Sequence, residues 1–322
     1  MTSSCAKTEA TDFDEKYIVV DSEIGDYKGD NVNLDSPPKV SFAIPTLNNE
    51  DVLDKCLKSI INQEYPDLEI IIVDNGSTDR TVEIAEKYTD KIYFDDGLLG
   101  SVRQTGVENS TGQILALFDS DIILPHKKWL INAIKYFNYS DRISTVWPMN
   151  VTPPNGSLTA RLYLNHWRVI IEDRIKKKRG IFGGGNALFL RDCIEEIGGI
   201  SRTVHWGEDF DWAKKLKERG YQVVFIRDPL YHDTMQSLRE FAKKQFTAAK
   251  TFTVTGFQLM NLSSSDVFYE QIVLGTKGMI EGLVRYRDPS WLLFPLFVFI
   301  RGIAYGYTHI KNLTNNKEGV IP

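Results

Sequence analysis

The sequence predicts an α/β protein with an open, mostly parallel sheet flanked by helices, followed by a helical and strongly apolar C-terminal region. Three observations predict this architecture. Short apolar runs alternate with amphipathic segments from residue 39 to residue 137. The run LEIIIVD has no polar alternation, as expected of a parallel strand covered on both faces. An apolar stretch occupies residues 289–310. Alternating strands and helices over about 100 residues are typical of a parallel sheet.

The composition is that of a globular chain. It has 322 residues, 42% of them hydrophobic, which suffices for one large domain or two modest ones. The net charge of −5 argues against a general nucleic-acid-binding protein. The three cysteines, Cys5, Cys56 and Cys193, are far apart and lack metal-ligand spacing, so we expect free thiols in a reducing compartment.

Residues 1–38 are expected to form a flexible N-terminal extension. The segment has little hydrophobic periodicity and ends in DSPPK. Its polar, acidic start has neither the basic residues nor the apolar run of a secretory signal peptide, so we expect a cytoplasmic location.

Residues 39–137 supply the regular part of the predicted sheet. Residues 50–63 carry apolar side chains at helical spacing, and residues 77–88 begin with a capping signal. The strands are expected at 39–44, 68–74, 91–95 and 113–119, and the helices at 50–63, 77–88, 101–109 and 126–137.

The second half is less regular. We expect a long helix at 158–180, a glycine-rich turn entering a strand at 181–191, a helix at 207–220 and a strand at 221–228. The helix at 207–220 has acids at its start and bases at its end, which matches the helix dipole. From about residue 234 the chain looks helical. The predicted domains are therefore 39–233 and 234–322.

Polar clusters follow three of the predicted strands. PTLNNE follows the first, DNGSTD the second and DSD the fourth. Ligands of open parallel sheets bind beyond the carboxyl ends of the strands. The sequence therefore predicts one ligand site built from these clusters.

Asp119 and Asp121 suggest a metal site. Residues i and i+2 of an extended segment point to the same side, and two neighbouring carboxylates repel each other unless a cation lies between them. Carboxylate oxygens suit Mg²⁺ or Mn²⁺, which often share their ligands with substrate phosphates. The alternative is a polar turn after a strand.

Asp74 and Arg103 have two interpretations each. Asp74 ends a buried strand and could accept a hydrogen bond from a base N–H; the alternative is helix capping by Ser77 or Thr78. Arg103 could reach a diphosphate or hold Asp119, whereas a solvated surface arginine is the default.

The order of these motifs resembles the family 2 glycosyltransferases with the GT-A fold. The matching pieces, within residues 39–233, are FAIPTLNNEDVLDKCLKSIINQ, IIIVDNGSTDRT, GSVRQTGVENSTGQILALFDSD, FGGGNALFLRDCIEEIGG and GEDFDWAKKLKERG. The resemblance implies a nucleotide-diphospho-sugar donor, a divalent metal (Mg²⁺ or Mn²⁺) and inversion at the anomeric carbon.

The resemblance also assigns roles to single residues. On the nucleotide side, Pro45, Thr46 and Asn48 would border the nucleoside, with Glu50 nearby, Asp74 would meet the base, and Arg103 would lie near the diphosphate. Asp119 would approach the ribose and the metal, Asp121 would ligate the metal, and Ser120 between them would belong to the donor site. Gly184, Gly185 and Asn186 would line the donor-sugar site. Glu208 would lie in the same site, and Asp209 would be the catalytic base. His232 would approach the metal or the diphosphate, although a histidine that ends a strand is as often structural.

Two departures from the family pattern bear on function. The chain has RQTG where the family often has RNxG, which is a mild change. It lacks the Q-x-x-R-W signature of processive synthases, since FTAAKTF follows Gln245. This absence favours transfer of one sugar over polymerisation.

Two other functions compete with this one. A sugar nucleotidyltransferase would need a glycine-rich, lysine-bearing loop after the first strand, but IPTLNNED has neither residue. A non-catalytic nucleotide-sugar-binding module should have lost an acid, yet Asp119, Asp121 and Asp209 are all present.

The apolar segment 289–310 predicts an in-plane, monotopic membrane attachment. Its uncharged run ends at Arg301, short of the ~18 residues expected of a confident span. Pro295 would kink a helix, and aromatic residues flank the run as they do at membrane interfaces. The alternatives are a buried C-terminal helix pair or a dimer contact.

A membrane-facing enzyme suggests a lipid-linked acceptor, such as a polyprenyl phosphate or a lipid-linked glycan, or a cell-surface polysaccharide precursor. We expect the enzyme at the cytoplasmic face of the membrane. The basic run RIKKKRG (174–180) could face anionic lipid, or it could be a solvated helix end.

Overall fold

The computed structural model describes residues 17–25, 29–177, 185–204, 207–251 and 263–317. The chain forms two compact units. The α/β unit comprises residues 1–150 and 181–232, and the helical unit comprises residues 151–180 and 233–322. The long helix predicted at 158–180 therefore belongs with the C-terminal helices, whereas the sequence led us to expect one continuous domain over 39–233.

The α/β unit is built on a nine-stranded sheet. Its order is β1 (Ile18–Val20), β9 (Gln222–His232), β7 (Ile143–Val151), β8 (Ala187–Leu190), β5 (Ile114–Leu117), β2 (Val40–Thr46), β3 (Leu68–Asp74) and β4 (Ile92–Phe94), with β6 (Ile122–Ile123) paired to β9. The pairs β2–β3, β2–β5, β3–β4 and β1–β9 are parallel, whereas β8 is antiparallel to β5 and β7. The predicted mostly parallel open sheet is confirmed.

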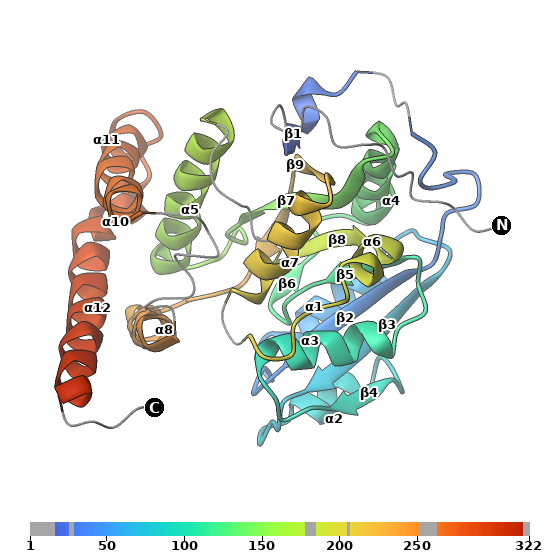
Figure 1. The fold of residues 1–322 in the computed structure, drawn as a ribbon, viewed down its shortest axis with the longest axis horizontal. Coiled ribbons are helices and arrows are strands. Elements are labelled where there is room, and N and C mark those ends of the chain that lie inside the picture. Colours follow the sequence, from blue (N-terminus) through green and yellow to red (C-terminus); the bar gives the residue numbers. More distant parts are fainter. Residues whose placement is uncertain (1–16, 26–28, 178–184, 205–206, 252–262, 318–322) are drawn as a thin grey trace. The chain divides into compact units, whose positions relative to one another are not determined.

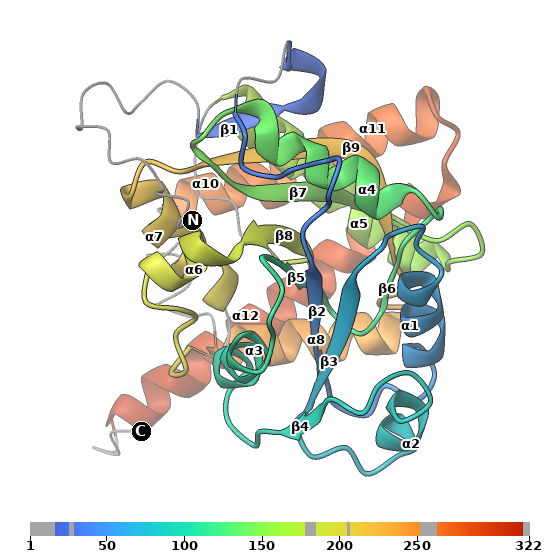
Figure 2. The same ribbon diagram turned by 90° about the vertical axis from the view of Figure 1, so that its right-hand side faces the viewer.

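Helices cover both faces of the central strands. The helices of this unit are α1 (Leu53–Ile61), α2 (Thr81–Ala85), α3 (Leu99–Glu108), α4 (Trp129–Ile134), α6 (Arg191–Glu196) and α7 (Glu208–Glu218). Figure 2 shows α1 and α3 on opposite sides of β2 and β3. Phe42 and Ile72 pack on the α1 side, while Ile71 and Val73 pack with Val102 of α3. Because each fully buried side chain contributes about 1.5–3 kcal/mol, the two-sided burial explains the unbroken apolar run in β3.

Three strands lie where none was predicted: β1, β6 and β7. β1 pairs with β9 through Ile18–Val223 and its neighbours, so part of the expected N-terminal extension is structured. β7 contains Pro148, which ordinarily argues against a strand. The β7–β8 ladder pairs Thr145 and Val146 and stops before the proline, so Pro148 need not donate a hydrogen bond to β8.

The helix predicted at 77–88 begins only at Thr81. Ser77 does not cap it, because the Ser77 hydroxyl donates to Asp74 Oδ1 at 2.5 Å instead. The expected capping by Ser77 or Thr78 is therefore wrong. A polar turn takes the place of the first helical turn, and this turn follows the end of β3, beside the end of β2.

The helical unit has its own core. It contains α5 (Leu158–Lys176), α8 (Leu238–Thr251), α10 (Ser264–Phe268), a π-helical segment (Tyr269–Leu274), α11 (Gly275–Val284), a 3₁₀ turn (Pro289–Leu293) and α12 (Phe294–Lys317) (Figure 1). Leu162, Phe241, Trp291 and Phe297 are buried together. A Cβ on Gly282 would lie 2.1 Å from Trp291, so α11 approaches that ring as only glycine permits.

Within the described residues, one helical stretch is long and apolar enough to cross a membrane. It runs from Pro289 to Thr308, and 28% of it is buried inside the structure.

Candidate active site

The carboxyl ends of β2, β3 and β5 meet at one edge of the sheet. β2 and β3 end side by side at the paired residues Thr46 and Asp74, and β5 runs parallel to β2 on its other side. The three polar clusters therefore meet at the same edge, as their positions after parallel strands predicted.

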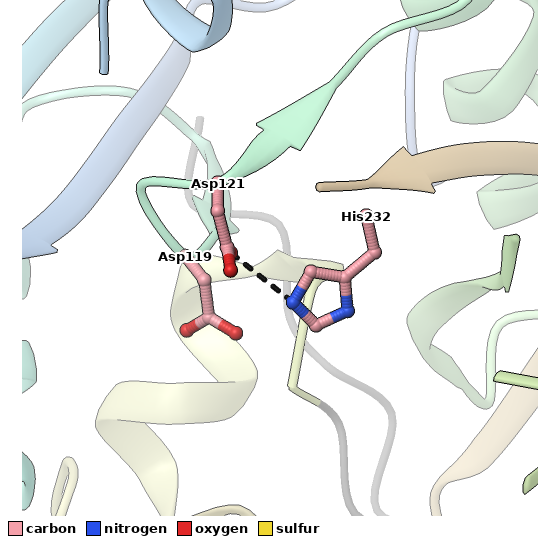
Figure 3. Close-up of side chains that lie close together, drawn as sticks. All are labelled: Asp119, Asp121 and His232. Atoms are coloured by element: carbon pink, nitrogen blue, oxygen red, sulfur yellow. Dashed lines mark ion pairs between the residues drawn. The ribbon is translucent and has the colours of Figure 1, made fainter. Parts of the chain in front are cut away.

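Two aspartates and a histidine converge at this edge (Figure 3). Asp119 and Asp121 lie between β5 and β6, and His232 ends β9. The β6–β9 pairing aligns Ile122 with His232 and so brings the ring beside Asp121, with Nε2 3.1 Å from Oδ1. One ligand atom from each of the three side chains lies within 4.8 Å of the others. Two carboxylates and one imidazole could hold a divalent metal, and the two carboxylates are of the ligand type that Mg²⁺ and Mn²⁺ prefer.

Arg103 is buried beneath this cluster, not solvated on the surface. Its Nη2 donates to Asp119 Oδ1 at 2.6 Å, and its Nε donates to Glu208 Oε1 at 3.2 Å. The guanidinium also lies over Trp212, 5.9 Å from the ring centroid. Of the two functional roles predicted for Arg103, the structure supports the one in which it holds Asp119. The Nη1 atom is buried without a hydrogen-bond partner among the described residues, so one donor of this guanidinium stays open.

Asn186 fixes Asp119 from the other side. Its Oδ1 accepts from the Asp119 main-chain N–H at 2.7 Å, and its Nδ2 donates to Asp119 Oδ2 at 3.1 Å. Asn186 takes a left-handed backbone conformation, with φ of 62°, to do so. Gly185 precedes it, and a Cβ there would lie 3.6 Å from Asp209 Oδ2. The segment Gly185–Asn186, just before β8, therefore lies against both Asp119 of the candidate metal site and the predicted base. Gly184 lies outside the described residues.

Glu208 and Asp209 form the first turn of α7, after Gly207, whose φ is 88°. Asp209 Oδ1 accepts from the Phe210 main-chain N–H at 3.0 Å. Although Asp209 lies at a helix N-terminus, burial and the nearby negative charge of Glu208 raise the pKa of Asp209 to about 7. Burial also raises the pKa of Glu208, against the opposing charge of Arg103. A helix dipole contributes about 0.3–1 kcal/mol, less than one pKa unit, so burial prevails here.

The residues predicted to meet the nucleoside form a cross-linked pair of loops. Asp74 is 1% exposed and accepts four hydrogen bonds, from the Thr46 hydroxyl, the Ser77 hydroxyl and the main-chain N–H groups of Gly76 and Ser77. These bonds give Asp74 a clear structural role, and base recognition by its carboxylate stays a prediction.

The side chains of Asn48 and Glu50 tie the same loops together. Asn48 Oδ1 accepts from Thr78 N at 2.9 Å, and Glu50 Oε2 accepts from Arg80 N at 3.1 Å. Pro45 is the last residue but one of β2, before Thr46, and Ser120 is 6% exposed between the two aspartates.

Asn150 was not predicted from the sequence to be a site residue. This residue lies near the end of β7, the strand between β9, which carries His232, and β8, which follows Asn186. Its side-chain oxygen is buried and has no hydrogen-bond partner among the described residues. Only the pairing of distant strands places Asn150 on the strand between β8 and β9, since a single asparagine carries no signal of its own in the sequence.

Comparison with known proteins identifies relatives of this chain. The model of Glycosyl transferase family 2 matches residues 41–198. Glycosyltransferase AglE of Haloferax volcanii is 31% identical over 222 residues, which cover 66% of this chain and 72% of AglE. Glycosyltransferase GlyA of Streptococcus pneumoniae is 36% identical over 89 residues, which cover 26% of this chain and 13% of GlyA.

Solved structures share the fold at lower identity. The mannosyltransferase PcManGT from Pyrobaculum calidifontis, in complex with GDP-Man and Mn²⁺, superposes with a TM-score of 0.58 at 17% identity, over 83% of this chain and 87% of PcManGT. Glucosyl-3-phosphoglycerate synthase from Mycobacterium tuberculosis superposes with a TM-score of 0.51 at 15% identity, over 72% and 83% of the two chains.

Proposed function

Because this chain belongs to glycosyl transferase family 2, we propose that it transfers one sugar from a nucleotide-diphospho-sugar to an acceptor, with inversion. The observation that carries the proposal is the arrangement at the sheet edge. A three-residue metal-ligand set and a carboxylate of raised pKa flank the same segment, Gly185–Asn186.

Asp119, Asp121 and His232 would hold a divalent metal. The donor set fits, because it offers two hard carboxylate oxygens and one imidazole nitrogen within 4.8 Å. When bound, the metal would stabilise the negative charge of the leaving nucleoside diphosphate. The fold neighbour PcManGT binds GDP-Man with Mn²⁺, which supports this choice of metal and donor class.

Arg103 would act as a positioning residue for this set. It neutralises Asp119 and Glu208 from below, so the carboxylates can lie close together before a metal binds. Its unpartnered Nη1 supplies one more N–H that a diphosphate oxygen can accept from.

Asp209 would accept the proton of the acceptor hydroxyl. A general base works best when its pKa lies near the working pH, and the pKa of about 7 meets this condition at neutral pH. Gly185 keeps the space beside its Oδ2 free of a side chain. Asn150 would accept a hydrogen bond from a sugar hydroxyl, because its buried amide oxygen lacks a partner.

The acceptor is proposed to be lipid-linked, and the enzyme to lie in the plane of the cytoplasmic membrane surface. The support comes from the C-terminal helix. Its large exposed side chains recur every three or four residues and so share one face: Leu292, Leu296, Phe299, Ile303 and Tyr307. No Asp, Glu, Lys or Arg is among the exposed residues of Pro289–Thr308. Trp291, Phe294 and Phe297 are buried on the other face, so the helix is amphipathic in a way that suits the bilayer interface.

An assay of donor binding and donor hydrolysis tests the proposed function. The purified full chain, in detergent, is titrated with GDP- and UDP-sugars in Mn²⁺ and then in EDTA, and donor hydrolysis is followed in the same samples. Mn²⁺-dependent binding with turnover is expected for at least one donor. Binding without turnover would instead indicate a non-catalytic module. Absence of any Mn²⁺-dependent donor binding would contradict the proposal.

A further inference from the structure

Among the described residues, Arg301 of α12 has no carboxylate partner, whereas the buried arginines Arg103 and Arg174 both form ion pairs. Arg103 contacts two carboxylates, and Arg174 forms a two-pronged ion pair with Glu270 at 2.8 and 2.6 Å. Arg301 has no carboxylate within ion-pairing distance in the described part of the chain, and its hydrogen-bond partners are all uncharged. A guanidinium held inside an apolar helical unit ordinarily needs an anionic partner.

The three partners of Arg301 come from three different segments of the helical unit. Arg301 Nε donates to Gln245 Oε1 of α8 at 3.2 Å, and its Nη1 donates to His166 Nδ1 of α5 at 3.0 Å and to Gln271 Oε1 of the π-helical segment. The guanidinium also lies over Phe241, 5.4 Å from the ring centroid. These contacts fix the plane of the guanidinium.

The partners leave a set of N–H donors unused. A guanidinium only donates, so both glutamines must turn their oxygen toward it and their amide nitrogen elsewhere. In the described residues, Arg301 Nη2, Gln245 Nε2 and Gln271 Nε2 have no acceptor. Gln245 is only 7% exposed, but none of the three nitrogen atoms is fully buried, so an anion can reach them. Several unpaired donors beside an uncompensated positive charge are the chemistry of an oxyanion site.

We propose that Arg301, Gln245 and Gln271 bind a phosphate group within the helical unit. Arg301 supplies the charge and a rigid fork, and the two amides supply further N–H donors. The phosphate belongs either to a lipid, as the proposed lipid-linked acceptor would provide, or to free inorganic phosphate. Only the identity of the natural ligand rests on the proposed function, since the site itself rests on the unpaired donors.

The test measures phosphate binding by calorimetry, on the full chain in detergent. The probes are inorganic phosphate, farnesyl phosphate, and phosphatidylcholine vesicles with and without phosphatidic acid. We expect Arg301→Gln to weaken phosphate binding about ten- to hundredfold, the loss of one charged hydrogen bond. Arg285→Gln is the matched control, because Arg285 is exposed and paired only with Glu281. That variant should bind like the wild type.

Gln245→Glu keeps the test valid if Arg301→Gln does not fold. The new carboxylate would lie at the Arg301 Nε and supply the missing anion internally. We expect a higher melting temperature together with at least about tenfold weaker phosphate binding. A tenfold preference for farnesyl phosphate over inorganic phosphate would assign the site to a lipid phosphate, and equal affinity would assign it to free phosphate.

The proposal is overturned if no probe binds, or if Arg301→Gln and Gln245→Glu bind phosphate as the wild type does. Mn²⁺-dependent donor binding is measured on the same samples. By the proposed function, this donor binding requires Asp121 and His232 and not Arg301. Absence of donor binding would therefore count against the proposed transferase function and not against the phosphate site.

Discussion

Replacing Asp209 by asparagine separates the proton-accepting role of this side chain from its role at the start of α7. Asparagine keeps an acceptor for the Phe210 main-chain N–H and caps a helix as well as aspartate, but it cannot take up a proton. Transfer should therefore fall about 10²–10⁴-fold at neutral pH, while Mn²⁺-dependent donor binding stays close to normal. In the wild type, kcat/KM should fall as the pH drops below about 7, because the base becomes protonated.

The same substitution should stabilise the protein at alkaline pH. The pKa of Asp209 is raised from 3.8 to about 7 by burial and by Glu208. The folded chain holds this proton more tightly than the unfolded chain, so stability is lost as the pH rises from 3.8 through 7. The full difference corresponds to about 4 kcal/mol at 1.36 kcal/mol per pKa unit. Part of this energy belongs to Glu208, whose pKa is raised as well. We therefore expect Asp209→Asn to raise the free energy of unfolding by about 1–3 kcal/mol at pH 8 and by little at pH 4.

Urea unfolding at pH 4 and pH 8 measures this gain, and single-turnover transfer measures the loss of activity. Asp211→Asn is the control, since Asp211 lies in the same helical turn but pairs with Lys215 at 2.7 Å. Near-normal transfer by Asp209→Asn would refute its role as the base, and Glu208 would be tested next. An equal effect on stability at both pH values would refute the electrostatic reasoning.

Further substitutions test the other parts of the site. Asp121→Ala should abolish Mn²⁺-dependent donor binding in calorimetry, and unchanged affinity would rule out the metal site. Arg103→Met should lower the free energy of unfolding, measured with urea, by about 3 kcal/mol, because Asp119 and Glu208 would lose the positive charge that pairs with them. An unchanged free energy would mean that solvent already screens the two carboxylates. Asn150→Ala should raise the KM for the donor about tenfold, with little change in melting temperature, by removing one hydrogen bond to the sugar; an unchanged KM would count against that contact. Replacing both Phe299 and Ile303 by aspartate should release the protein from phosphatidylglycerol vesicles in a flotation assay, whereas continued flotation would point to another anchor or a dimer contact.

Local patterns in the sequence predicted most of the sheet. Apolar runs and helical spacing predicted β2, β3 and the helix between them, because burial imposes these periods on neighbouring residues, although β2 extends two residues beyond the predicted end at residue 44. Strands β1, β6 and β7 were missed. β1 and β6 are three and two residues long and gain their stability by pairing with β9, and β7 contains a proline. Such pairings join residues far apart in the chain and leave little local signal.

The features of the candidate site also divide into those that the sequence predicted and those that only the fold reveals. The sequence alone determined which residue types the site contains, since Asp119 and Asp121 follow one strand at the spacing that suits a metal. Only the tertiary structure decided their surroundings: Arg103 beneath Asp119, His232 beside Asp121, and a pKa of about 7 for Asp209. These properties depend on burial and on the distance between charges, which the fold sets, in part by bringing together residues as far apart in the chain as Asp121 and His232.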